Sequence, residues 1–149
     1  MLPRLPAAHL EWALGHLNAP QRSLFLAMRP SDQAHAVRVA KRLAVDAPPA
    51  WVIEAALLHD CGKPAHYGLL ARCAGVLLSP VAKYFPDSFS QKWLKVYLEH
   101  DQWSIEAAEA VQTSTPAIQL MKAAAKLDVH CSTEVAEWLD RFKSSDAHG

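Results

Sequence analysis

Apolar residues recur at intervals of three and four positions along nearly the whole chain, and no run alternates strictly between apolar and polar residues. This spacing is typical of amphipathic helices, whereas a half-buried strand needs a period of two. The sequence therefore predicts an all-α fold, a compact bundle of about six to eight helices. Prolines divide the pattern into segments of helical length, and they stand at Pro6, Pro20, Pro30, Pro49 and Pro116, while Pro80 would kink a helix over residues 67–84.

Length and composition favour a single globular domain. The chain has 149 residues and 51% of them are hydrophobic, so it can form a core without disulfides or a structural metal. Lysine plus arginine number 15, and aspartate plus glutamate also number 15. Because this balance leaves no basic field to hold a phosphate backbone, we expect no nucleic-acid polymer as a partner, although a small nucleotide is compatible with it.

Cysteine usage and the N-terminus favour a cytoplasmic protein. Cys61, Cys73 and Cys131 lack the C-x-x-C spacing of a structural zinc site, so we expect them to be reduced. The N-terminus has no signal-peptide pattern. The most apolar later stretch, residues 69–82, contains Arg72 and is too short to cross a bilayer, so no membrane partner is expected. This stretch either packs inside the subunit or provides the contact surface of a homodimer.

The segment from Ala55 to Lys63 reads Ala-Ala-Leu-Leu-His-Asp-Cys-Gly-Lys, an apolar helix that ends in the adjacent His59 and Asp60. An imidazole nitrogen and a carboxylate oxygen together suit a divalent transition metal. The helix has little polar surface and must be central, so an ionised aspartate buried at its end would cost several kcal/mol, which a cation would remove. The alternative is a helix that ends in two exposed polar residues.

The residues after this pair close the helix. Gly62 can take the left-handed conformation that ends a helix. Lys63 would then lie at the rim of the site, where it is free to meet an anion.

His35 lies on the preceding helix, at the edge of an apolar face, where a lone histidine is usually a hydrogen-bonded structural residue. Its surroundings, Ser-Asp-Gln-Ala-His-Ala-Val-Arg-Val-Ala over residues 31–40, together with the segment 55–63, resemble the HD-domain superfamily of metal-dependent phosphohydrolases. The resemblance implies a helical bundle in which a histidine, a His-Asp pair and a later aspartate hold one or two divalent metals. Such sites activate water for attack on a phosphate ester.

By this resemblance, His35, His59 and Asp60 are metal ligands, and Asp60 also helps to position the nucleophile. Lys63 matches the family's lysine after the glycine, which would bind a phosphate oxygen and stabilise its charge during catalysis. Arg38, one turn after His35, is a second candidate for substrate binding, or else a solvated surface charge.

The second half of the chain carries the remaining ligands. The resemblance implies a late aspartate that binds the metal, and both Asp146 and Asp128 fit, with the helix count after His100 favouring Asp146. His100 resembles an extra histidine of some family members that serves a second metal or the substrate, and we expect it to be catalytic; Ser104 stands where glycine is usual. Histidines of related sequences are replaced by the alanines at 123–125, which argues against a full two-metal site.

These features predict a metal-dependent phosphohydrolase that acts on a small phosphate ester or a nucleotide, with Fe, Mn, Co, Ni or Zn as the divalent ion. One HD-like domain would cover residues 1–149, with its core at 31–146 and a helical extension at 1–28. The alternative is a catalytically impaired HD-like module that binds a nucleotide or a protein partner. A helical interaction protein with the five tryptophans on its surface ranks last, because tryptophans at helical spacing are more often core residues.

Overall fold

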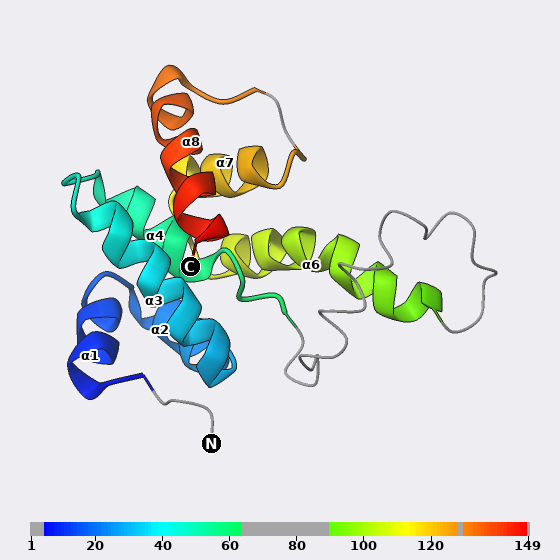
Figure 1. Ribbon diagram of the computed structural model, residues 1–149, viewed down its shortest axis with the longest axis horizontal. Helices are drawn as coiled ribbons and strands as arrows, with labels where there is room; N and C mark the ends of the chain where they lie inside the picture. The colour runs from blue at the N-terminus through cyan, green and yellow to red at the C-terminus, as the bar shows by residue number, and fades with distance from the viewer. Residues whose placement is uncertain (1–4, 64–89, 128–129, 149) are drawn as a thin grey trace.

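The structure is a computed structural model that describes residues 5–63, 90–127 and 130–148 (Figure 1). These residues form seven helices and no strand, which confirms the predicted all-α fold. The helices are α1 (Ala7–Gly15), α2 (Ala19–Leu26), α3 (Pro30–Ala44), α4 (Ala50–Leu58), α6 (Ser90–Ala110), α7 (Thr115–Ala124) and α8 (Thr133–Ala147). The apolar stretch 69–82, and with it the suggested homodimer contact, lies outside the described residues. No helix in the described ranges combines the length and the apolar character that crossing a membrane requires.

The helix α4 is the centre of the bundle, as its apolar sequence predicts. It packs against α2, α3 and α7, while α8 packs against α3 and α7 (Figure 1). Most of its side chains are buried: Val52, Ile53, Ala55, Ala56, Leu57 and Leu58. The amphipathic α3 turns towards the core the apolar residues that its spacing predicts, Ala36, Val37, Val39, Ala40 and Leu43. Burial of this apolar surface is the main contribution to the stability of the fold, and it holds the C-terminal end of α4 in position.

A polar network fastens α4 to the helices on both sides of it. Glu54 accepts hydrogen bonds from the side chain of Gln21 in α2 and from the backbone N–H and hydroxyl of Ser114, just before α7. Gln21 is buried and also forms a capping box with Asn18 at the start of α2. Because a buried amide without a partner is costly, the Glu54 carboxylate fixes α4 relative to α2 and α7.

The chain leaves α4 in close contact with α6. The N–H of Gly62 donates to Oγ of the buried Ser104 at 2.9 Å. A Cβ atom on Gly62 would lie 2.2 Å from Ser104 N and 2.5 Å from the carbonyl carbon of Trp103. No glycine in the described part of the chain has a positive φ, so the left-handed conformation expected at Gly62 is wrong. Glycine stands here because the two backbones approach closely.

Replacing Gly62 by alanine should therefore destabilise the protein. We expect Gly62→Ala to lower the free energy of unfolding by about 1–3 kcal/mol, because the new methyl group overlaps the backbone of α6. The matched control is Gly15→Ala at the end of α1, where no described atom lies within 4 Å of the new Cβ. That variant should be unchanged or more stable by up to about 1 kcal/mol. Equal effects of the two substitutions in urea denaturation would contradict this account.

Candidate metal centre

Three helices bring four titratable side chains to one place. The helix α3 packs against both α4 and α8, so the packing of these helices determines where the side chains meet. The four are His35 of α3, His59 and Asp60 at the end of α4, and Asp146 in the last turn of α8.

Asp146 bridges the two histidines. Its Oδ1 atom lies 2.9 Å from His35 Nε2 and 3.1 Å from His59 Nε2. One ligand atom from each of His35, His59 and Asp146 lies within 4.8 Å of the other two. The late aspartate favoured by the helix count thus meets both histidines. The alternative, Asp128, lies outside the described residues.

Asp60 contacts the same two ring nitrogens from a more buried position. Its Oδ2 atom lies 3.7 Å from His35 Nε2 and 3.6 Å from His59 Nε2, and the side chain is 4% exposed. The Lys63 ammonium forms an ion pair with Oδ2. Asp60 therefore contributes a buried negative charge that faces both imidazoles as well as Lys63.

Both carboxylates are ionised at neutral pH. Burial alone would raise the pKa of Asp60, but the charges of His59, Lys63 and His35 outweigh burial and hold the pKa below its ordinary value. Burial acts in the same direction on Asp146, and the hydrogen bonds and charges of His35 and His59 hold its pKa well below the ordinary value. The site therefore carries two negative charges that the protein must balance.

The partners of the two ring nitrogens of His59 determine which of these atoms carries a proton. Nδ1 lies 2.9 Å from the backbone oxygen of Ala56, and because a carbonyl oxygen only accepts, Nδ1 carries a proton and donates it. Nε2 faces the carboxylate oxygens of Asp146 and Asp60, which are also acceptors. An unprotonated Nε2 would turn its lone pair towards two negative charges. The arrangement therefore calls for either a second proton or a cation at Nε2.

Without a metal, a proton occupies Nε2 of His59. Burial would lower the pKa of His59, but the carboxylates of Asp60 and Asp146 outweigh burial and raise it to about 9. The imidazolium then balances part of the negative charge at neutral pH. A proton and a metal ion would compete for the same nitrogen atom.

The donor set fits a divalent cation. Imidazole nitrogen and carboxylate oxygen are common ligands of Mn, Fe, Co, Ni and Zn. The 2.9 and 3.1 Å separations of Asp146 Oδ1 from the two histidines are hydrogen-bond distances, and they bring the three donor atoms close enough together to share one ion. The backbone contact at Nδ1 of His59 is the outer hydrogen bond that orients a ligating imidazole. His35, His59, Asp60 and Asp146 would therefore hold the ion.

A compact cavity of about 90 Å³ adjoins His59 and Asp146. The ring of Phe142 packs edge-on against His59, with the two centroids 5.6 Å apart. Pockets for whole small molecules usually measure several hundred Å³, so this cavity admits only solvent or the compact end of a larger molecule. Its walls are formed by His59, Asp101, Ile105, Met121, Ala124, Ala125, Phe142 and Asp146.

Two of these walls are alanines where the resemblance implies histidines. Ala124 and Ala125 at the end of α7 both line the cavity, and neither offers a ligand atom. The side of the cavity that a second metal would need is therefore apolar.

Asp101 is a site residue that the sequence interpretation missed. It lines the cavity together with His59 and Asp146, and its side chain is 45% exposed. His100 Nε2 lies 3.0 Å from Asp101 Oδ1. The histidine is thus one residue removed from the cavity wall, and its catalytic role stays a prediction. The available signal was the dipeptide itself, since His100-Asp101 repeats the His59-Asp60 pair.

Two residues that were predicted to bind phosphate, Lys63 and Arg38, differ in their surroundings from what the sequence predicted. Lys63 is not free to meet an anion, because its ammonium pairs with Asp60 and its side chain is only 12% exposed. Arg38 is exposed on α3 and lines a different cavity, between α1 and α3, that contains none of the four candidate metal ligands. Their roles in binding a substrate stay predictions.

The chain matches no protein-family model, no curated protein and no solved structure. Membership of the HD-domain superfamily therefore stays a prediction from the sequence.

The raised pKa of His59 makes the stability of the metal-free protein depend on pH. The pKa rises from 6.5 to about 9 on folding, so protonation of His59 contributes its full stability below pH 6.5, and this contribution is lost as the pH rises towards 9. We expect the free energy of unfolding of chelator-treated protein to fall across this range in urea denaturation. His59→Gln should remove that part of the slope. A wild-type profile parallel to that of the variant would contradict the assignment.

Proposed function

We propose that this protein is a metal-dependent phosphohydrolase that uses a single divalent cation and acts on a small phosphate ester or a nucleotide. The observation that carries the proposal is the meeting of His35, His59 and Asp146 at one carboxylate oxygen, with the buried Asp60 beside them. The resemblance of the α3 and α4 segments to the HD-domain superfamily supports a phosphate ester as the substrate. No other feature of the sequence selects the reaction.

The four side chains would have different roles in binding the cation. A divalent cation, when bound, supplies a Lewis acid and lowers the pKa of water, as phosphate-ester hydrolysis near neutral pH requires. His35 and His59 offer their Nε2 atoms, and His59 gives up its second proton to do so. Asp146 and the buried Asp60 contribute negative charge that makes the site selective for a divalent ion over a monovalent one.

Lys63 and Asp101 act next to these ligands. Lys63 keeps Asp60 ionised through their ion pair, and its charge adds to the attraction for a phosphate group. Asp101 lines the cavity and contacts His100, so this pair can carry a proton to the leaving oxygen. The cavity of about 90 Å³ receives the phosphoryl end of the substrate, and the remainder of a phosphate ester or nucleotide extends beyond it.

Metal analysis and turnover test the proposal together. We expect wild-type protein to retain about one equivalent of divalent metal after mild purification and to release phosphate from members of a panel of phosphate esters and nucleotides. His59→Ala and Asp146→Ala should each lower the metal affinity at least about tenfold, because each removes a ligand of the shared site. His16→Ala is the control, since His16 is exposed and bonds to the backbone of Trp12 in its own helix.

Equal metal content in wild type, His59→Ala and Asp146→Ala would contradict the metal site itself. Metal that binds as expected, without phosphate release from any member of the panel, would contradict hydrolysis alone.

The role of Asp101 is open to a separate test. In metal-loaded protein, Asp101→Asn should lower kcat by about 10²–10⁴-fold, because an amide cannot carry the proton, while the metal content stays the same. The pH profile of kcat should also lose one of its limbs. Asp140→Asn, an exposed position on α8, is the matched control. Unchanged kcat in Asp101→Asn would exclude the residue from proton transfer.

A catalytically impaired module is the second candidate function. The apolar cavity walls at Ala124 and Ala125, where the resemblance implies histidines, favour it. Such a protein would be stabilised thermally by metal and by a nucleotide without turnover. The hydrolysis panel separates the two functions directly.

A further inference from the structure

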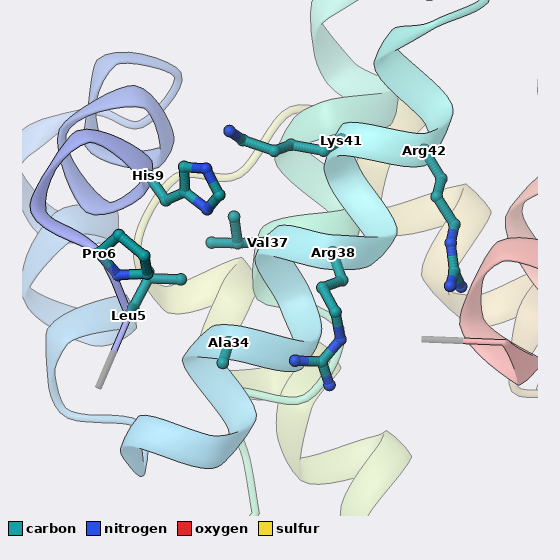
Figure 2. A pocket seen from close by; sticks show the side chains of 8 residues that line it. All are labelled: Leu5, Pro6, His9, Ala34, Val37, Arg38, Lys41 and Arg42. Carbon is teal, nitrogen blue, oxygen red and sulfur yellow. The ribbon is translucent and has the colours of Figure 1, made fainter. Parts of the chain in front are cut away.

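A second cavity, of about 410 Å³, lies between α1 and α3 (Figure 2). It is within the size range of pockets that hold whole small molecules. Its apolar side consists of Leu5, Pro6, Ala34 and Val37, and its polar side of His9, Arg38, Lys41 and Arg42. In Figure 2, His9 reaches from α1 towards Val37 of α3 and Lys41 extends towards α1, whereas Arg38 and Arg42 extend from α3 away from α1, with Arg42 on the side of α8.

The charge of this cavity has one sign. Three of its eight lining residues, Arg38, Lys41 and Arg42, are basic and none is acidic, although the whole chain has no net charge. Lys41 is held over the ring of Trp12, with its Nζ 5.3 Å from the centroid. Arg42 donates from Nη1 to the backbone oxygen of Ser145 at 3.2 Å. Both contacts orient the cations without neutralising them.

Arg38 is the least engaged of the three. It is exposed, and the described residues provide it with neither an ion pair nor a hydrogen bond. Its guanidinium is therefore available to a ligand, and this planar group can donate two parallel hydrogen bonds to a phosphate.

We propose that the cavity between α1 and α3 binds a small organic phosphate that has an apolar or aromatic body. The phosphate group would meet Arg38, with Lys41 and Arg42 adding attraction. The body would pack on Leu5, Pro6 and Ala34, where its burial contributes the apolar part of the affinity. Neither inorganic phosphate nor a neutral aromatic molecule satisfies both sides of the cavity.

This site goes beyond the proposed hydrolytic function and uses other residues. None of His35, His59, Asp60 and Asp146 lines the cavity. Chelator-treated protein therefore tests the site separately from metal binding and from turnover.

The probe is 1-naphthyl phosphate, titrated into the full chain in the presence of EDTA and followed by calorimetry and by NMR. We expect one binding site per chain, with an affinity at least about tenfold higher than for inorganic phosphate or for 1-naphthol, because each of these lacks one half of the interaction. The amide signals that shift should belong to α1 and α3. Affinity should fall as the salt concentration rises.

Two variants and one control locate the site. Arg38→Gln should weaken binding about tenfold, because it removes the charged donor pair. Ala34→Leu should weaken it as well by filling the apolar side, without any change of charge. Lys143→Gln removes one positive charge at an exposed position of α8 away from the cavity lining and should change the affinity less than about twofold.

Absence of saturable binding by wild type would overturn the proposal. So would equal weakening by Arg38→Gln and Lys143→Gln, which would mean non-specific attraction. Amide shifts centred on His59, Asp101 and Asp146 in place of α1 and α3 would assign the phosphate to the metal centre and would likewise overturn it. Retained far-UV circular dichroism and an unchanged unfolding midpoint check that each variant is folded.

Discussion

The meeting of Asp146 with two imidazoles is the interaction on which the candidate site depends, and the packing of α3 against α4 and α8 makes it possible. One carboxylate oxygen at the end of α8 contacts Nε2 of His35 and of His59, and Asp60 contacts the same nitrogens from within the protein. Two ionised carboxylates this close to each other and to a protein core require positive charge. The imidazolium of His59 provides it in the metal-free state, and the Nδ1 contact with Ala56 leaves only Nε2 for that purpose. A proton and a divalent ion are thus alternative solutions to one electrostatic problem.

The rest of the fold serves to hold the end of α4 at this point. The apolar faces of α3 and α7 bury α4, and Glu54 ties it to α2 and to the start of α7. At its C-terminal end, Gly62 lies so close to α6 that any side chain there would overlap the backbone of Ser104. The buried Ser104 then has a structural purpose, because its hydroxyl accepts the Gly62 N–H. This explains a serine where the resemblance implies glycine.

Sequence reasoning predicted the parts of this structure that depend on local pattern. Helical spacing of apolar residues is a local property, and it predicted the all-α fold and the central place of α4. The meeting of His35 with a residue 111 positions later is a tertiary property, and it entered only through a family resemblance that left Asp128 and Asp146 both open. The left-handed conformation predicted for Gly62 was wrong. Glycine is needed there because the backbone of α6, which is far along the chain, approaches it closely. Asp101 was missed for a similar cause, since its place on the cavity wall depends on how α6 meets α7 and α8.

Opposite charges are separated along α3 although the whole chain is neutral. His35 faces the two carboxylates, while Arg38, one turn later, belongs to a cavity with basic residues and no acidic one. Under the proposed functions, this separation imposes an order of events at one site and not at the other. In the metal-free state Lys63 and the His59 imidazolium balance the charges of Asp60 and Asp146. A divalent ion that replaces the proton on His59 would leave the site positive, so the metal must precede the phosphate. The cavity between α1 and α3 needs no such step, because three basic residues and no acidic one line it from the outset.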